Sequence, residues 1–295
     1  KLTTLALDTG KSPPVSFVLD WKANKATQWH LPSAPEVDAT RFARAKLESF
    51  PARDGTAIPM FVRRPATCEK PCPVIVDFHG GPEGQAQRIF NPVVQGLVAA
   101  GHIVLVPNVR GSTGYGKRWY SMDDVKLRLE SVADLADLRA WVPTVGGDPD
   151  RVALYGGSYG GYMVLASLMH YSDRIRAGVD IVGISDFTTF LTNTESYRRD
   201  LRRAEYGDER TPEMQEVFAR ISPARHSDRI ASRLFVAQGK NDPRVPYTEA
   251  EQIVDRVRRN GVPVWYLRAE NEGHGFQRKE NADYQFYAMV RFLQE

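Results

Sequence analysis

Residues 152–161 read VALYGGSYGG, the most informative stretch of the sequence for the fold. An apolar run typical of a buried strand leads through Gly-x-Ser-x-Gly into a helix-like pattern. Glycines two positions either side of the serine are needed in such a turn, because side chains there would collide with neighbouring backbone. The turn lifts the Ser158 hydroxyl to the carboxyl end of the strand, with a helix amino terminus behind it. An ordinary tight turn shares these glycines, but the flanking strand and helix and the additional Gly161 favour Ser158 as a nucleophile.

Outward from this stretch, short apolar runs alternate with amphipathic patterns. The expected strands are residues 74–78, 103–106, 152–155, 178–182, 234–238 and 264–267. The expected helices are residues 92–100, 131–142, 159–170, 248–260 and 282–293. Strands that are nearly continuous in apolar residues are typical of a parallel sheet covered on both faces. The pattern therefore predicts an α/β fold, a doubly wound and mostly parallel sheet with helices on both faces.

The first 65 residues follow a different pattern. Two pairs of short apolar runs each flank a polar turn: residues 15–19 with 26–30, and residues 47–51 with 58–63. Both pairs predict antiparallel hairpins. We therefore divide the chain into an N-terminal β-hairpin segment, residues 1–65, and a main domain, residues 66–295. The hairpins are interpreted either as an antiparallel edge of the main sheet or as the remnant of another domain.

A serine hydroxyl is a weak nucleophile at neutral pH, so it needs a base that is itself oriented by a carboxylate. After a turn of this kind the acid and then the histidine are expected downstream. Asp242 follows the strand at 234–238, and His274 lies between two glycines after the strand at 264–267. The sequence thus predicts a Ser158, Asp242 and His274 triad on an α/β-hydrolase fold. The other five histidines occupy positions typical of surface or packing residues.

Acyl transfer also needs backbone donors for the oxyanion, one after the nucleophile and one from a Gly-rich loop after an early strand. The amide of Tyr159 is the first candidate. The amide of Gly81, in His79-Gly80-Gly81-Pro82, is the second. His79 precedes this loop, and we expect it to have a structural role there instead of acting as a base.

Five motifs together resemble the prolyl oligopeptidase family of serine peptidases, over about residues 73–295. In chain order they are HGGP (79–82), NVRGSTGYG (108–116), GGSYGGY (156–162), DPRVP (242–246) and GHGF (273–276). The His-Gly-Gly-Pro form resembles the acylaminoacyl peptidase branch, whereas prolyl endopeptidases and dipeptidyl peptidases carry Tyr at the place of His79. No tyrosine hydroxyl donor to the oxyanion is therefore expected.

The resemblance also implies substrate-binding residues. Arg244, two residues after the triad acid, matches the family's arginine that contacts substrate carbonyls. An apolar specificity pocket is expected from Tyr159 together with Ile184, Phe187 and Phe190. The same aromatic residues fit simple core packing equally well.

Family members normally carry an amino-terminal β-propeller that restricts access to the site, and this chain is far too short to hold one. The first 65 residues resemble the tail of a last blade plus the lead-in to the hydrolase domain. We therefore expect a catalytic domain separated from a longer chain, with a β-propeller domain or a second chain covering the site.

Charge and hydropathy limit the classes of binding partner that the chain is expected to have. The chain has 39 basic and 36 acidic side chains, a formal charge of +3, which gives no strong reason to expect nucleic acid or an anionic membrane. No stretch approaches the roughly 18 apolar residues of a spanning helix. The basic run at 198–205 contains interleaved acids, as on a solvated helix face with ion pairs. The compartment, cytoplasmic or exported after signal removal, stays open.

Cys68 and Cys72 either form a small disulfide or remain unpaired loop thiols. Two thiols without clustered histidines cannot complete a tetrahedral zinc shell. The triad requires no metal or organic cofactor, so none is expected.

The expected activity is that of a serine peptidase acting on short peptides through an acyl-enzyme, of the oligopeptidase, dipeptidyl-peptidase or acylaminoacyl-peptidase type. A carboxylesterase on the same fold shares every catalytic part and differs only in substrate. A catalytically silent hydrolase-fold binding protein is the alternative from another class.

Overall fold

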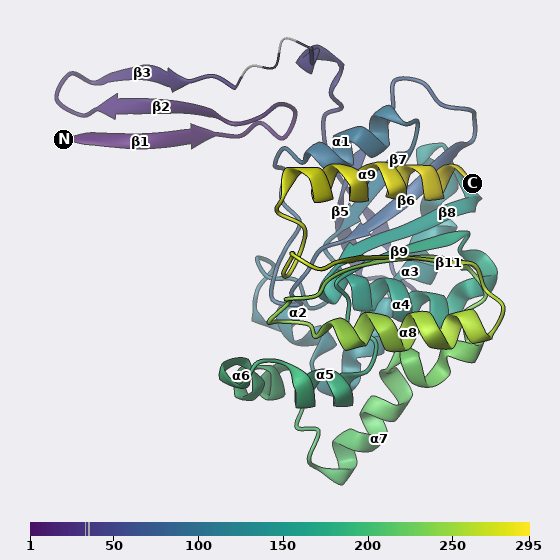
Figure 1. Cartoon of the computed structure of the whole chain (residues 1–295). Helices are drawn as coiled ribbons and strands as arrows, with labels where there is room; N and C mark the ends of the chain where they lie inside the picture. Colours follow the sequence, from purple (N-terminus) through teal and green to yellow (C-terminus); the bar gives the residue numbers. More distant parts are fainter. Residues whose placement is uncertain (33, 35) are drawn as a thin grey trace.

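The main sheet has eight strands in the order β11-β10-β9-β8-β6-β7-β5-β4 (Figure 1). The structure is a computed structural model that describes residues 1–32, 34 and 36–295. The strands are β4 (Lys46–Pro51), β5 (Ala57–Arg63), β6 (Cys72–Phe78), β7 (Ile103–Pro107), β8 (Gly147–Gly157), β9 (Ala177–Ile181), β10 (Arg233–Gly239) and β11 (Val264–Ala269). Strands β6 to β11 are parallel, and β5 is antiparallel to both of its neighbours.

Helices cover both faces of this sheet (Figure 1). They are α1 (Pro92–Ala99), α2 (Lys117–Tyr120), α3 (Arg128–Trp141), α4 (Tyr159–Tyr171), α5 (Phe187–Asn193), α6 (Ser196–Tyr206), α7 (Pro212–Ile221), α8 (Tyr247–Arg259) and α9 (Lys279–Gln294). Helices α1 and α9 lie on one face, and α3, α4 and α8 lie on the other. Helices α5, α6 and α7 belong to the long connection between β9 and β10.

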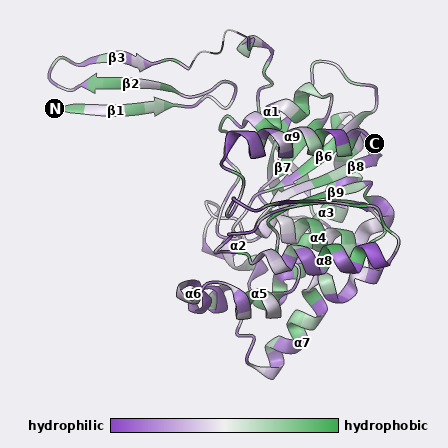
Figure 2. Ribbon diagram, in the orientation of Figure 1, coloured by the Kyte–Doolittle hydropathy of each residue, from purple (hydrophilic) through white to green (hydrophobic). Residues whose placement is uncertain are grey.

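Alternation along the central strands divides the core into two layers. Val74 and Val76 of β6 pack with α3 and α4, whereas Ile75 between them packs with α1 and α9. Apolar residues of the inner strands and the inward faces of the helices concentrate here (Figure 2). Because successive side chains of a strand point to opposite faces, both sides of these strands must be apolar.

The α/β-hydrolase architecture predicted from the sequence is confirmed, and each expected strand and helix is present within a few residues of its expected limits. Helices α2, α5 and α7 were not predicted. Helices α5 and α7 each begin at a side-chain cap, since Asp186 accepts from the Thr188 amide and Thr211 from the Met214 amide. None of the helices in the described residues is long and apolar enough to cross a membrane.

The two N-terminal hairpins belong to different sheets. Strands β1 (Leu2–Leu7), β2 (Val15–Asp20) and β3 (Lys25–His30) form a separate antiparallel sheet that projects from the body (Figure 1). The second hairpin, β4 and β5, is the antiparallel edge of the main sheet. The main sheet therefore begins at β4, well before the boundary expected at residue 66.

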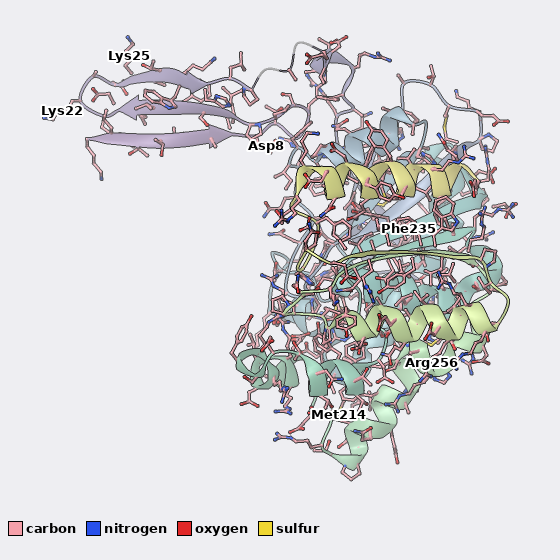
Figure 3. The ribbon with its side chains drawn as sticks, in the orientation of Figure 1. Asp8, Lys22, Lys25, Met214, Phe235 and Arg256 are labelled. Atoms are coloured by element: carbon pink, nitrogen blue, oxygen red, sulfur yellow. A yellow bond between two sulfur atoms is a disulfide. The ribbon has the colours of Figure 1, made fainter. Side chains whose placement is uncertain are left out.

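The projecting sheet contributes little to the core. None of its strand residues is buried, and Trp29 is 77% exposed. Lys22 and Lys25 lie at its tip, whereas Phe235 lies deep in the body (Figure 3). Its tether to the body is polar, because the Asp8 carboxylate accepts from the Phe90 amide at 3.0 Å.

Deletion of residues 1–32 is expected to leave the body folded, with a melting temperature within a few degrees of the parent's. Deletion of residues 1–65 is expected to abolish cooperative unfolding, because it removes β4 and β5 with the fully buried Phe50, Ile58, Met60 and Val62. Each of these side chains contributes about 1.5–3 kcal/mol by burial. Calorimetry of both truncations checks this, and a folded product lacking residues 1–65 would contradict it.

Candidate active site

Ser158 occupies the turn between β8 and α4. Its φ of 58° and ψ of −117° lie outside the regions that a serine normally adopts, as in the strained turns that present nucleophiles. The Ser158 amide donates to the Ile181 carbonyl at 2.8 Å, and its own carbonyl accepts from the Tyr162 amide. The backbone is thus fixed on both sides, and the half-buried side chain stands at the carboxyl end of the sheet.

The glycines around Ser158 permit backbone contacts that side chains would prevent. A Cβ at Gly156 would lie 2.3 Å from the Gly160 carbonyl oxygen. A Cβ at Gly160 would lie 2.1 Å from the carbonyl oxygen of Phe78, the last residue of β6. The first turn of α4 therefore touches the end of β6, which brings the loop after β6 to Ser158.

A buried carboxyl group lies behind this turn. Asp180 of β9 is fully buried, and a Cβ at Gly161 would fall 2.3 Å from its Oδ1. Burial raises the pKa of Asp180 to about 7, against a lowering by the Gly183 amide. Asp180 was not among the expected site residues, and the only sign of it in the sequence is an acidic residue within an apolar strand.

Asp242 and His274 meet on the loops that follow β10 and β11. Nδ1 of His274 lies 2.8 Å from Oδ2 of Asp242. The other oxygen of Asp242 accepts from the amides of Arg244 and Val245 at 2.8 and 3.0 Å. Because the carboxylate holds Nδ1 as a donor, Nε2 of the imidazole is the nitrogen free to accept a proton.

Ser158 and His274 lie at the same edge of the sheet but share no hydrogen bond among the described residues. The intervening strand ends are joined by backbone, since the Val182 amide donates to the Ala237 carbonyl at 2.9 Å. A nucleophile–base contact is often long in the absence of substrate and shortens when substrate binds.

Gln238, near the end of β10, positions the Asp242 loop. Its Nε2 lies 3.1 Å from Oδ2 of Asp242 and 3.2 Å from the carbonyl oxygen of Val245. A Cβ at the neighbouring Gly239 would lie 2.1 Å from the Gly273 carbonyl oxygen, so the Asp242 and His274 loops are in backbone contact. Gln238 is a positioning residue that the sequence analysis treated only as part of a strand.

Glu272 secures the other side of the histidine loop. Its carboxylate accepts from the amides of Gln277 and Arg278, at 3.1 and 2.9 Å, and from the Asn281 side chain at 2.8 Å. Burial raises the pKa of Glu272, but these hydrogen bonds outweigh it and the net shift is downward. The carboxylate thereby fixes the chain between His274 and α9.

The loop after β6 passes directly beside Ser158. A Cβ at Gly80 would lie 3.6 Å from the Cβ of Ser158. Gly81 has a φ of +144°, and a Cβ there would lie 2.6 Å from the amide nitrogen of Glu83, so only glycine fits. Tyr159 is the first residue of α4, where the amide has no acceptor within the helix. The two expected oxyanion donors thus belong to the two segments that flank Ser158.

His79 anchors this loop to the NVRGSTGYG segment. Its Nε2 lies 2.8 Å from Oγ of Ser112, and its Nδ1 lies 2.8 Å from the Gly80 carbonyl oxygen. Burial lowers the pKa of His79, which favours the neutral imidazole. These contacts agree with the structural role expected for His79.

The same segment supports the loop at two further points. The side chain of Asn108 accepts from the Ala86 amide at 2.7 Å and donates to the Ala86 carbonyl at 3.1 Å. The Thr113 amide donates to the Gly84 carbonyl at 2.9 Å. The conspicuous NVRGSTGYG motif is therefore the scaffold of the candidate oxyanion loop.

A cluster of buried charged residues contacts the side chain of Tyr159. Arg128, with no exposed side-chain surface, donates to Asp123 at 2.7 Å and to Glu205 at 3.1 Å. The Tyr159 hydroxyl donates to Asp123 at 2.9 Å. Asp123, Asp124 and Glu205 lie close enough together for a metal ion, but Arg128 already pairs with two of these carboxylates.

The expected substrate-binding residues occupy two environments. Arg244 is exposed next to Asp242. Ile184, Phe187 and Phe190 are at most 2% exposed and belong to the main core cluster together with Tyr159. Their packing is that of core residues, and a role in lining a specificity pocket stays a prediction.

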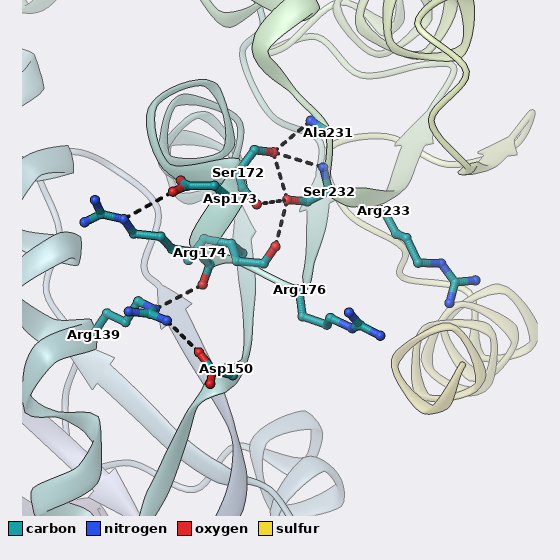
Figure 4. A pocket seen from close by; sticks show the side chains of 10 residues that line it. Arg139, Asp150, Ser172, Asp173, Arg174, Arg176, Ala231, Ser232 and Arg233 are labelled. Atoms are coloured by element: carbon teal, nitrogen blue, oxygen red, sulfur yellow. Dashed lines mark hydrogen bonds and ion pairs between the residues drawn. The ribbon is translucent and has the colours of Figure 1, made fainter.

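Other features lie away from this edge. Cys68, in the loop before β6, forms a disulfide with Cys72, the first residue of β6. An arginine-rich hollow of about 430 Å³ lies at the opposite edge, where β9 and β10 begin (Figure 4). Arg139 pairs there with Asp150, and Arg233 with Glu295. This hollow is remote from the carboxyl ends of the strands, where α/β proteins bind ligands.

A mostly parallel sheet with this serine turn after β8, an acid after β10 and a histidine after β11 defines an α/β-hydrolase. Residues 89–295 match the prolyl oligopeptidase family, and the chain belongs to this family. The resemblance drawn from the five motifs is thereby confirmed.

Individual relatives are substantially longer. A dipeptidyl aminopeptidase BIII from Pseudoxanthomonas mexicana is 33% identical over 261 residues, which cover 81% of this chain and 38% of that protein. An acylamino-acid-releasing enzyme from Arabidopsis thaliana is 26% identical, over 74% of this chain and 29% of that protein. The structure of a puromycin-hydrolyzing peptidase from Mycobacterium tuberculosis superposes with a TM-score of 0.91 at 25% identity, over 99% of this chain and 45% of that chain. The chain therefore spans less than half the length of these relatives.

Replacement Gly160→Ala is expected to lower the free energy of unfolding by about 2 kcal/mol or more, because the new Cβ overlaps the backbone at the end of β6. Gly157→Ala is the matched control, since the nearest atom to a Cβ there is the Ile181 carbonyl oxygen at 3.7 Å. Urea unfolding of both variants measures the difference. Equal stabilities would show that the contact between α4 and β6 does not constrain the turn.

Proposed function

We propose that this chain is the catalytic part of a serine peptidase that hydrolyses short peptides through an acyl-enzyme. Ser158 attacks the carbonyl carbon while Nε2 of His274 takes its proton, and Asp242 holds the imidazole in the required tautomer. His274 then gives the proton to the leaving amine, and water repeats the sequence to release the acyl group. The observation that carries the proposal is the 2.8 Å contact between Asp242 and His274 at the sheet edge that presents Ser158.

The developing oxyanion is stabilised by the amides of Tyr159 and Gly81. The first belongs to the amino terminus of α4, where the helix dipole also favours negative charge. The second belongs to a glycine whose φ of +144° turns the chain in a way that other residues rarely adopt. Preorganised donors of this kind act strongly because they need no rearrangement as charge develops.

Peptide hydrolysis is favoured over ester hydrolysis by the two relatives described above, which are named a dipeptidyl aminopeptidase and an acylamino-acid-releasing enzyme, although a third relative is named a probable carboxylic ester hydrolase. Arg244 is proposed to bind a substrate carbonyl, because its backbone is fixed by Asp242 while its side chain is exposed. Tyr159, Ile184, Phe187 and Phe190 are proposed to form the apolar wall of the specificity pocket. An apolar wall of this kind would favour uncharged side chains of the substrate at that position.

The projecting sheet is proposed to belong to a larger β domain that covers the site. A propeller blade is a four-stranded antiparallel sheet, and β1 to β3 supply three antiparallel strands. Several large apolar side chains of this sheet, including Leu2, Leu7 and Trp29, are exposed, as expected for strands that lack a packing partner. A β-propeller in the same chain or in a second chain would supply that partner.

Labelling by a fluorophosphonate probe is expected for the parent protein and not for Ser158→Ala, because the probe reports an activated serine. Turnover of acetyl-Ala or Gly-Pro amides is expected to fall about a million-fold in the same variant. Ser49→Ala, on the exposed edge strand β4, is the matched control. Absent labelling of a folded parent would support a silent binding protein, and turnover of short esters alone would support a carboxylesterase.

Replacement Asp242→Asn is expected to reduce kcat by about 10⁴-fold with little change in folding, because the amide favours the wrong imidazole tautomer. Steady-state kinetics with the preferred amide substrate measures the loss. Asp255→Asn, an exposed position on α8, provides the control and keeps full activity. A loss below tenfold would remove Asp242 from the proposed triad.

A further inference from the structure

Helix α6 presents one face to the candidate oxyanion loop. Residues 198, 202 and 206 are spaced four apart and therefore share a face of the helix. The Tyr206 hydroxyl donates to the Gly81 carbonyl at 3.4 Å. Arg202 contacts both carboxylate oxygens of Glu83, at 3.0 and 3.2 Å. The same face of α6 thus contacts the loop that passes beside Ser158.

Arg198 lies one turn further along this face and is half-buried. The Asp242 loop reaches the same region, because the Thr194 hydroxyl, just before α6, donates to the Arg244 carbonyl at 2.7 Å. Burial lowers the pKa of Arg198, and the positive charges of Arg202 and Arg244 lower it further. The face of α6 that carries Arg198 and Arg202 therefore lies between the loop after β6, which Arg202 contacts, and the loop that carries Asp242 and Arg244.

The other arginines of α6 are already engaged. Arg203 pairs with Asp200 and Glu209, and Arg199 donates to the Thr194 carbonyl at 2.9 Å. The basic run at 198–205 therefore has two sides. One side carries the polar contacts of Arg199 and Arg203, and the other faces the loop beside Ser158. Among the described residues, neither Arg198 nor Arg244 has a carboxylate partner.

Holding a half-buried guanidinium near two like charges is unfavourable unless an anion compensates it. A carboxylate suits this arrangement, because guanidinium groups bind carboxylates through short, charge-assisted hydrogen bonds. Glu83 is committed to Arg202 and so leaves Arg198 and Arg244 available to a ligand.

We infer that Arg198 and Arg244, next to the ion pair of Arg202 with Glu83, form a carboxylate-binding subsite beside Ser158 that selects peptides bearing an acidic group. The inference rests on the proposed function, since the subsite selects substrates only if Ser158 cleaves them. The carboxylate comes either from an acidic side chain near the cleaved bond or from the C-terminus of a short peptide. Arg198 contributes to binding and not to proton transfer, so its loss alters selectivity.

Binding to Ser158→Ala tests the subsite without requiring catalysis. The probes are acetylated hexapeptides in which one Glu is moved through an alanine-rich sequence, each paired with its Gln counterpart. Each peptide is prepared as the free acid and as the C-terminal amide, which distinguishes the two sources of the carboxylate. At least one carboxylate-bearing member is expected to bind about tenfold more tightly than its neutral partner by calorimetry.

Addition of Arg198→Gln is expected to reduce this preference to about twofold or less, because one charge-assisted contact is lost. Arg198→Lys retains the charge and is expected to keep most of the preference. Arg220→Gln, at an exposed position of α7, is the matched control and leaves the preference unchanged. Circular dichroism confirms that the variants are folded.

The same peptide pairs are then hydrolysed by the parent and by Arg198→Gln with Ser158 intact. The expected result is a selective fall in kcat/KM for the acidic member, with the value for the neutral member nearly unchanged. Equal binding of acidic and neutral peptides by Ser158→Ala, or a preference that survives Arg198→Gln, would overturn the subsite. Carboxylate-selective binding without any hydrolysis would support the subsite and contradict the proposed peptidase function.

Discussion

The contact between the first turn of α4 and the carboxyl end of β6 is the constraint on which the site depends. It requires a residue without a Cβ at position 160, next to the carbonyl of Phe78. The strand order places β6 beside β8 while β7 lies on the far side of β6, so the chain leaves the two strands in opposite directions. Crevices for ligands form at such switch points in α/β sheets. The serine turn and the loop after β6 meet at this point.

The strained backbone of Ser158 persists because its surroundings leave no alternative. Nearly every residue of α4 is buried, and the turn is fixed by a hydrogen bond to β9. The strain is local and the packing that maintains it extends over the whole helix. A rigid nucleophile beside rigid donors is the arrangement that acyl transfer requires.

A cluster of buried charged residues fixes helix α6, which borders the site on the side away from the sheet. Arg128 joins α3 to Asp123 and to Glu205 of α6, and its guanidinium lies 4.9 Å from the ring centre of Tyr206. A buried ion pair costs desolvation energy, which several hydrogen bonds at once can offset. The cluster holds α6 against Tyr159 and the loop after β6. The charges of α6 thereby become part of the surroundings of Ser158.

The strands of the parallel sheet and the helices between them could be predicted from local sequence. Runs such as residues 74–78 must be apolar on both faces, so their strands were predictable, as were the amphipathic helices between them. Helix α5 was not predicted, because its seven residues are too few to show a helical period, and Phe187 and Phe190 fitted a pocket wall and core packing equally well. The run at 198–205 forms the ion pairs that its interleaved acids predict, but its contact with the loop after β6 is not predictable, because local spacing does not reveal which residues face another loop.

The fold class, the candidate triad and the two candidate oxyanion segments are predictable from the residues alone, because each depends on residue types at short range or in a fixed chain order. Only the folded chain shows which residues support them: Gln238 contacts Asp242, Ser112 contacts His79, and Arg128 contacts Tyr159. Only the folded chain also shows that β4 and β5 belong to the main sheet, whereas β1 to β3 form a separate sheet. These outcomes depend on contacts between segments far apart in the chain, and no local pattern encodes which distant segment will supply the partner.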